Sequence, residues 1–293
     1  MNNFQQAVQN NEFLVTAEVA PPKGSDPSHM LEVAKLLKGR VHAVNITDGS
    51  RAVMRMSPLV AAVLLLQEGI EPVYQVACRD RNRIGLQGDL LGAQALGIKN
   101  VLALTGDPMK AGDYPDAKGV FDLESVRLLK LISQLNAGLD GNDKPLPDGS
   151  TSLFHGGAVD PQITSRSSLK SRFEKKIAAG AQFFQSQLIS DFDLLEQFMK
   201  EVAIPYGKPI LAGIFLLKSA KNAEFINRCV PGVHIPQTTI DRLAASAKPL
   251  QTGIEIAAEQ VLLAKKMCQG VHLMAVKRED LIPHILDLAE IKI

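Results

Sequence analysis

Eight short apolar runs, rich in β-branched and aromatic residues, recur along the chain, and each ends at polar or glycine residues. The runs are Phe13–Ala20, His42–Thr47, Pro72–Ala77, Asn100–Leu104, Ser152–Val159, Gln182–Ile189, Pro209–Phe215 and Val271–Val276. The spacing of apolar residues between them predicts helices over Pro27–Lys38, Ser57–Gln67, Asp122–Leu135, Arg166–Ala179, Asp191–Glu201, Ala220–Arg228 and Ile254–Gln269. Strict alternation of strands and helices predicts a parallel sheet. Eight such units in 293 residues favour a closed (β/α)8 TIM barrel.

Glycine punctuates the ends of these units, because it tolerates the left-handed geometry that often follows a helix. The glycines that stand before a predicted strand are Gly39, Gly69, Gly97, Gly138, Gly180 and Gly270. No G-x-G-x-x-G motif follows the first strand, which weakens a dinucleotide-binding open sheet. The polar segment Leu139–Ser150 is interpreted as an insertion before strand five. We therefore expect residues 1–293 to form one catalytic domain.

Composition excludes several other classes. The chain carries 32 basic and 31 acidic side chains without a long basic run, which argues against a nucleic-acid partner. Its three cysteines are widely spaced, as in proteins of a reducing compartment. The N-terminal segment lacks the pattern of a signal peptide, and no apolar run approaches the ~20 residues of a membrane span. These features predict a cytoplasmic protein.

Catalytic residues of a TIM barrel lie where the strands end, at the carboxyl face. This rule alone directs attention to the polar residues Glu18, Asn45, Thr47, Asp48, Gln75, Arg79, Thr105, Asp107, Asp160 and Gln187.

Glu18 is the only acidic residue within the first apolar run. Alternation places it on the same face as Leu14 and Thr16. A carboxylate inside a barrel is costly to desolvate, which favours its protonated form and suits a proton donor near neutral pH. The alternative is a structural glutamate paired with a lysine at the rim.

Two loops next to the predicted strand ends allow both a binding and a structural interpretation. Thr105-Gly106-Asp107-Pro108 offers a glycine that a ligand can approach and an acceptor carboxylate, but Asp107 is also a common turn cap. The cluster from Cys78 to Arg83 holds three arginines, which suit a diphosphate or a carboxylate. That cluster is equally consistent with a solvated loop that begins a helix.

In the segment from Lys175 to Gln187, Gln187 is placed to hydrogen-bond a heterocycle, whereas Gln182 and Gln185 are interpreted as outward-facing strand residues. Lys176 lies near a helix C-terminus, where lysines commonly interact with the helix dipole. The six histidines show no ligand spacing, so a catalytic zinc site is weakly supported and no metal is expected.

Five local sequences, in order, resemble the methylenetetrahydrofolate reductase family: TAEVAPPKG, VNITDG, QGDLLGAQALGIKNVLALTGDP, GDYPDAKGVFDLESVRLL and KKIAAGAQFFQSQ. The similarity runs from Phe13 to the strand at Val271–Val276. The resemblance implies a (β/α)8 barrel that holds FAD, with FMN as the less favoured flavin. The flavin would accept hydride from NAD(P)H and pass it to 5,10-methylenetetrahydrofolate.

The resemblance also implies roles for individual residues. Glu18 matches the general acid that assists opening of the folate imidazolidine ring, and Asp107 matches an aspartate that contacts the pterin and tunes the flavin environment. The implied cofactor-binding positions are Thr47, Gln75, Thr105, Gly106, Asp107, Phe121, Asp122, Ala158 and Lys176. The implied substrate-binding positions are Glu18, Asp107, Gln187 and Asn222.

Three positions depart from the pattern of bacterial family members, which carry a histidine at Gln75, an arginine at Thr105 and a tyrosine before Pro161. The TGDP and GDYPDAKGVFD motifs instead resemble those of a divergent branch, which includes reductases that work with partner subunits. Two alternatives therefore stay open. One is a flavin- and folate-binding barrel that receives electrons from a partner protein, with homo-oligomers also possible. The other is a pterin-dependent methyltransferase barrel without flavin.

Overall fold

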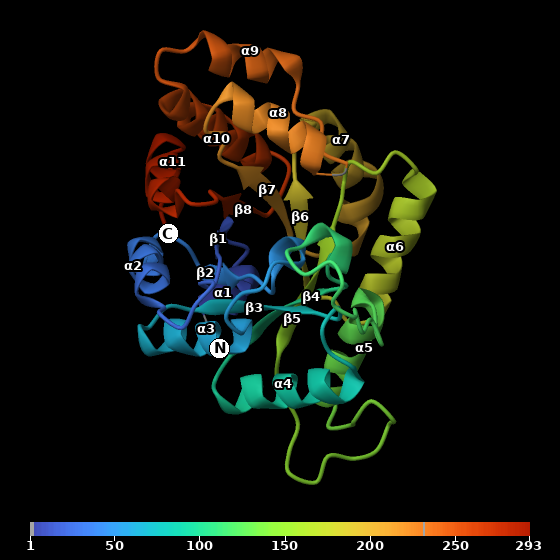
Figure 1. The fold of residues 1–293 in the computed structure, drawn as a ribbon. Helices are drawn as coiled ribbons and strands as arrows, with labels where there is room; N and C mark the ends of the chain where they lie inside the picture. The colour runs from blue at the N-terminus through green and yellow to red at the C-terminus, as the bar shows by residue number, and fades with distance from the viewer. Residues whose placement is uncertain (1–2, 231) are drawn as a thin grey trace.

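The computed structural model describes residues 3–230 and 232–293 and forms a closed barrel (Figure 1). Its parallel strands are β1 (Leu14–Val19), β2 (Ala43–Ile46), β3 (Pro72–Ala77), β4 (Asn100–Leu104), β5 (Phe154–Val159), β6 (Phe183–Leu188), β7 (Ile210–Phe215) and β8 (Gly270–Met274). Each strand pairs with its sequence neighbours, and β1 pairs with β8 to close the ring. The predicted TIM barrel is confirmed, and all eight strands fall within the predicted runs except at the start of β8.

Helices surround this barrel. They are α1 (Asn3–Gln9), α2 (Ser28–Leu37), α3 (Pro58–Gln67), α4 (Arg83–Ala95), α5 (Ser125–Asn136), α6 (Arg166–Ala178), α7 (Phe192–Phe198), α8 (Ala220–Cys229), α9 (Gln237–Ala245), α10 (Pro249–Lys265) and α11 (Ile282–Leu288). Single turns are η1 (Ser50–Ala52), η2 (Met109–Ala111), η4 (Ile204–Tyr206) and η5 (Glu279–Leu281), and the π-turn η3 (Met199–Ala203) continues α7. Among the described residues, no helix is both long and apolar enough to cross a membrane.

Four helices, α1, α4, α9 and α11, were not among those predicted. In α4 the pattern is diluted by Gly85, Gly88 and Gly92, which are poor helix formers. The start of α4 is fixed by an N-cap residue, Asn82, whose side chain accepts hydrogen bonds from the backbone N–H groups of Ile84 and Gly85. Similarly, α5 begins at Ser125 rather than Asp122, because Glu124 caps it.

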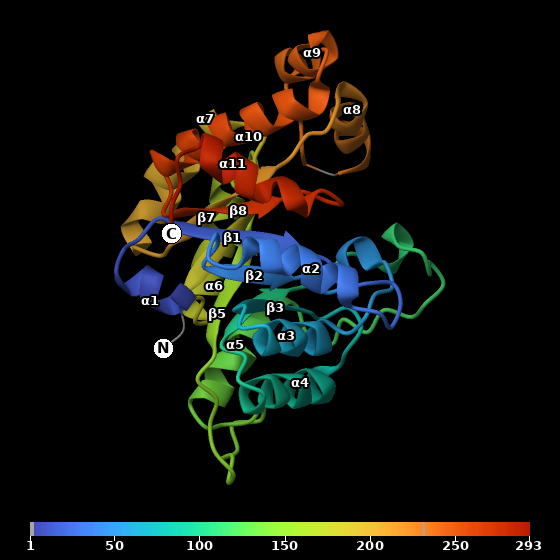
Figure 2. The same ribbon diagram turned by 90° about the vertical axis from the view of Figure 1, so that its left-hand side faces the viewer.

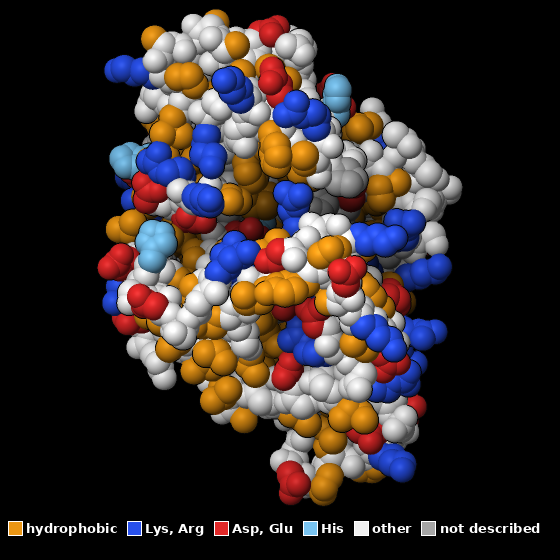
Figure 3. Space-filling model, viewed as in Figure 1, with side chains coloured by type: hydrophobic (Ala, Val, Ile, Leu, Met, Phe, Trp, Pro, Cys, Tyr) orange, Lys and Arg blue, Asp and Glu red, His pale blue; other side chains and the backbone are white. Residues whose placement is uncertain are grey.

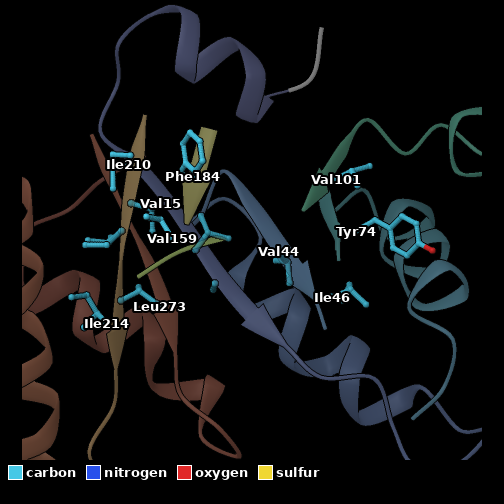
Figure 4. Packing of buried hydrophobic residues seen from close by; sticks show 14 of the residues in the cluster. Val15, Val44, Ile46, Tyr74, Val101, Val159, Phe184, Ile210, Ile214 and Leu273 are labelled. Carbon is cyan, nitrogen blue, oxygen red and sulfur yellow. The ribbon is translucent and has the colours of Figure 1, made fainter. Parts of the chain in front are cut away.

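Alternation along the strands divides the core into two parts. Outward-facing side chains such as Val15, Val44 and Ile214 pack against the surrounding helices in the main apolar cluster (Figure 4). Inward-facing side chains near the strand starts, among them Leu14 and Phe183, form a second cluster with Phe4 of α1. Figure 2 shows α1 at the end of the barrel opposite the arrowheads of β1 and β8. Helix α1 therefore closes the amino-terminal end, and the carboxyl end stays open for a site.

Five of the six predicted helix-ending glycines have φ between +68° and +102°, the region that favours glycine. Gly270 is the exception, since it is the first residue of β8. A Cβ at Gly270 would lie 2.4 Å from the backbone oxygen of Leu14, so glycine here permits the close contact between β8 and β1. The assignment of Gly270 as a helix stop was wrong for that reason.

Candidate functional site at the carboxyl end of the barrel

Glu18 lies near the end of β1, where its Oε2 atom is 3.7 Å from Nε2 of His272 on β8. The Glu18 side chain is 22% exposed and that of His272 is 5% exposed. No lysine pairs with this carboxylate within the described residues, which argues against the structural alternative of a rim salt bridge. The arrangement gives one partly accessible carboxylate at the barrel mouth with a histidine directly behind it.

Below Glu18 the barrel interior is polar. Thr16, Asn45, Gln185 and His272 are all at least 96% buried and join one another by hydrogen bonds. The interpretation of Gln185 as an outward strand residue was wrong. Alternation from the inward-facing Phe183 places Gln185 inside the barrel, where its amide reaches side chains of β1 and β2.

Two further polar side chains lie at the inner wall. Thr47 follows β2 and is 1% exposed, and Gln75 of β3 is 5% exposed. Among the described residues, neither side chain has a hydrogen-bond partner. Buried polar groups usually have partners, so these two are suited to donate or accept hydrogen bonds with a bound ring system.

Three residues assigned to cofactor or substrate binding line one cavity of about 180 Å³: Ala158 at the end of β5, Lys176 of α6 and Gln187 of β6. A bulge in β6 exposes Gln187, since the register to β7 shifts between Gln185 and Leu188. Gly213 of β7 permits the bulge, because a Cβ there would lie 2.5 Å from the Gln187 backbone oxygen. The tertiary structure thus brings these three residues together from separate elements.

Lys176 is largely buried in this cavity, and its Nζ donates a hydrogen bond of 2.6 Å to the backbone oxygen of Ala158. Burial lowers the pKa of the Lys176 amine, an effect that the nearby Glu124 carboxylate opposes. Lys176 therefore faces the cavity, whereas the sequence also allowed a role as a helix-dipole partner at the surface. A cation here suits an electron-rich or anionic group of a ligand.

Residues of the segment after β4 make contacts within the protein. The Thr105 hydroxyl accepts a hydrogen bond of 3.1 Å from the Ser125 backbone N–H at the start of α5. The Asp107 carboxylate accepts one of 2.6 Å from the Arg51 backbone N–H. A Cβ at Gly106, where φ is +92°, would lie 2.9 Å from Cβ of Arg79. The glycine makes room for the end of β3, which gives a reason for Gly106 other than approach by a ligand.

Two of the other predicted positions, Asp122 and Asn222, also have local partners. Asp122 forms a bidentate ion pair with Arg83, which lowers the pKa of the Asp122 carboxyl. Phe121 has φ of +43° and is 38% exposed. Asn222 accepts a hydrogen bond of 3.1 Å from the Lys218 backbone N–H and stabilises the turn before α8. The structure does not bring Asp122 or Asn222 into the cavity that Lys176 lines.

All three arginines of the cluster after β3 form ion pairs with carboxylates of the same chain. Arg79 is 3% exposed and donates to the backbone oxygen of Gly49 and to Asp80. Arg81 pairs with Asp48 and Asp89, and Arg83 pairs with Asp122. The structural interpretation of this cluster is therefore favoured over binding of a diphosphate or a carboxylate.

Figure 3 shows the face of the molecule that Figure 1 presents, hollowed between the α8–α10 region above and the loops after β2 and β4 below. Charged side chains of both signs stand along the edges of this hollow. The fold and the collection of polar residues at the strand ends define a TIM barrel with a site at its carboxyl face.

A model of the methylenetetrahydrofolate reductase family matches residues 3–290, so the chain belongs to that family. It is 24% identical over 300 residues to a probable methylenetetrahydrofolate reductase (NADPH) of Caenorhabditis elegans, covering 97% of this chain and 43% of that protein. It is 25% identical over 235 residues to methylenetetrahydrofolate reductase 1 of Schizosaccharomyces pombe, covering 79% of this chain and 36% of that protein. The chain spans less than half the length of both relatives.

Solved structures share the fold at low sequence identity. An F420-dependent secondary alcohol dehydrogenase has a TM-score of 0.54 and 11% identity, covering 95% of this chain and 99% of that one. A 2,3-dimethylmalate lyase has a TM-score of 0.52 and 13% identity, covering 98% of this chain and 82% of that one. A protein from Aquifex aeolicus VF5 has a TM-score of 0.52 and 14% identity, covering 99% and 96%. These similarities support the barrel and carry no functional argument.

Proposed function

We propose that this chain uses a bound flavin, FAD, to reduce 5,10-methylenetetrahydrofolate to 5-methyltetrahydrofolate with NAD(P)H as reductant, and that residues 1–293 act as one catalytic domain. Family membership supplies the reaction, and one observation supports its mechanism in this chain. A partly exposed carboxylate, Glu18, stands at the open end of the barrel beside the buried His272.

The residues at the inner wall fit a flavin. The free polar groups of Thr47 and Gln75 suit the carbonyl and N–H edge of its ring system, and Lys176 and Ala158 would hold the cofactor from the neighbouring cavity. A bound flavin supplies the hydride transfer that amino-acid side chains do not perform. Gln187 would orient the pterin from the same cavity. Asp107 of the segment after β4 and Asn222 in the first turn of α8 would bind the folate from outside it.

Glu18 acts on the substrate in this proposal. Its protonated carboxyl donates a proton to the ring nitrogen of methylenetetrahydrofolate, so that the C–N bond breaks and an iminium carbon forms to accept hydride. The resulting carboxylate is stabilised by His272, whose Nε2 is 3.7 Å away. Glu18 is needed for this half of the reaction and not for reduction of the flavin by NAD(P)H.

Substitution Glu18→Gln separates the two halves. We expect the rate of flavin reduction by NADPH to stay within about twofold of wild type. The rate of flavin reoxidation by methylenetetrahydrofolate should fall by about 100-fold or more. Stopped-flow absorbance of the flavin measures both rates. Glu12→Gln is the matched control, because Glu12 also faces a histidine, His42, at 3.5 Å. Normal folate turnover by Glu18→Gln would exclude the general-acid role.

The same preparation tests the wider proposal. A yellow protein whose released flavin is FAD, and whose colour NADPH or NADH bleaches, supports it. The departures at Gln75, Thr105 and Asp160 favour a second candidate, a barrel that receives electrons from a partner protein. A flavin that neither nicotinamide bleaches would favour that candidate. A protein that stays colourless after reconstitution would favour a methyltransferase without flavin.

A further inference from the structure

The middle of the barrel interior is polar where apolar side chains are usual. TIM barrels generally fill this space with branched apolar residues. Here Thr16 and Asn45 are 0% exposed, Gln185 is 3% exposed and His272 is 4% exposed. They come from β1, β2, β6 and β8, and an apolar cluster that includes Leu14 and Phe183 lies beneath them. Burial of four polar side chains gains no stability over an apolar layer, so a role in the site explains them better.

The hydrogen bonds of this layer form a chain from Asn45 and Gln185 through Thr16 to His272. Asn45 and Gln185 form a reciprocal amide pair, with Nδ2 to Oε1 at 2.7 Å and Nε2 to Oδ1 at 3.2 Å. The Gln185 Nε2 also donates to the Thr16 hydroxyl oxygen at 3.1 Å. Thr16 in turn lies 2.9 Å from Nδ1 of His272. A hydroxyl that accepts from Gln185 has its own proton free to donate to His272.

Donation by the Thr16 hydroxyl to Nδ1 would fix the tautomer of the histidine. A neutral imidazole carries one proton, and the hydrogen bond at one nitrogen decides which nitrogen holds it. If Nδ1 of His272 accepts from Thr16, the proton is on Nε2. That nitrogen is the one that faces Oε2 of Glu18.

We propose that Gln185 and Asn45 are positioning residues for Glu18, because their paired amides orient the Thr16 hydroxyl and thereby keep the His272 proton on Nε2. Gln185 and Asn45 do not touch the substrate in this arrangement. They act through Thr16 and His272, and the Nε2 proton stabilises the Glu18 carboxylate after it has protonated the folate. The catalytic consequence rests on the proposed function, whereas the tautomer does not.

The tautomer is measured directly by nuclear magnetic resonance of the protein labelled with ¹⁵N-histidine, near pH 8, without substrate. The expected wild-type spectrum shows the His272 proton on Nε2, assigned by its loss in His272→Asn. In Thr16→Val the donor to Nδ1 is gone, so we expect the Nδ1 resonance to move toward that of a free ring. Thr16→Ser keeps a hydroxyl and should restore the wild-type shifts. A wild-type His272 with its proton on Nδ1 would overturn the proposal.

Gln185→Met tests the amide itself, because it keeps the length of the side chain and removes its donor. We expect the Nδ1 signal of His272 to shift and the folate half-reaction to slow by at least about tenfold, since a wrong tautomer is costly in related hydrogen-bonded sites. Reduction of the flavin should change less than twofold. Gln182→Met is the matched control on the same segment, because its side chain instead contacts the His155 backbone. Unchanged folate kinetics in both Gln185→Met and Thr16→Val would refute the positioning role.

The outcomes distinguish this inference from the proposed function. A wild-type protein with the Nε2 tautomer but no flavin or folate activity would contradict the function and leave the hydrogen-bond chain in place. A protein that reduces methylenetetrahydrofolate but carries the His272 proton on Nδ1 would support the proposed function and contradict the hydrogen-bond chain. Circular dichroism and urea unfolding of each variant show that a slow half-reaction is measured on folded protein.

Discussion

At the scale of single residues, two glutamate–histidine pairs lie at opposite ends of the barrel. Glu12 faces His42 near the start of β1, and Glu18 faces His272 near its end. Burial lowers the pKa of His42, although Glu12 raises it in part. Glu12 is outside the open face, whereas Glu18 stands in it, which is why only Glu18 is a candidate for chemistry.

Buried histidines should make the protein sensitive to acid. Burial lowers the pKa of His155 and His42 from the ordinary value of 6.5. In the unfolded chain these histidines keep the ordinary pKa, so below about pH 6.5 the unfolded chain binds more protons than the folded chain. The free energy of unfolding therefore falls as the pH falls. Each histidine contributes up to about 1.4 kcal/mol per pH unit within this window.

Urea unfolding of wild type and His155→Gln between pH 5.0 and 7.5 measures this effect. The expected result is a shallower loss of unfolding free energy in the variant below pH 6.5, whatever its stability at pH 7.5. Equal slopes for the two proteins would show that His155 is not kept neutral by burial.

At the scale of elements, the short helix α1 closes the amino-terminal end of the barrel with only seven residues. Phe4 makes edge-to-face contacts with the rings of Phe154 and Phe183, with distances between ring centroids of 5.9 and 5.1 Å. Glu71 holds the start of the helix, because its carboxylate accepts hydrogen bonds from the backbone N–H groups of Asn3 and Phe4. The seven residues of α1 are too few for a recognisable helical pattern, so only the packing revealed this element.

Phe4→Ala should therefore destabilise the barrel without changing the site. The loss of a fully buried ring is expected to lower the unfolding free energy by about 3–5 kcal/mol. Because Phe4 lies at the opposite end from Glu18, affinity for flavin at low temperature should stay within about twofold. Urea unfolding and a flavin titration measure the two quantities. A cost below about 1 kcal/mol would mean that α1 does not close the barrel in solution.

At the scale of the whole molecule, one part of the chain has an apolar core of its own. Helices α8 and α9 stand beyond α10 at the top of Figures 1 and 2. Their buried residues, with Ile226 and Leu243 among them, form a cluster separate from the main one. The barrel strands instead share the main cluster with most of the helices. We expect this pair of helices to open at a lower free energy than the barrel.

Hydrogen exchange tests that expectation. Amides of α8 and α9 should exchange faster than those of β1–β8, and Leu243→Ala should accelerate them without altering exchange in the strands. Leu135→Ala is the matched control, because Leu135 of α5 is also 0% exposed but belongs to the main cluster. That variant should accelerate exchange throughout. If Leu243→Ala accelerated the strands equally, the two regions would unfold as one unit.

The barrel, its strand positions and the candidate acid could be predicted from the sequence, because alternation and glycine stops are local signals that need no tertiary context. It also brought the family motifs into view. Local signals misassigned Gln185 and passed over His272, since each looked like an ordinary strand residue. Closure of β1 onto β8 places Thr16 opposite His272, and the diameter of the barrel lets Gln185 reach across to Asn45. Contacts between residues so far apart in the chain depend on how the strands close into a ring, so the surroundings of Glu18 could not be predicted from local sequence.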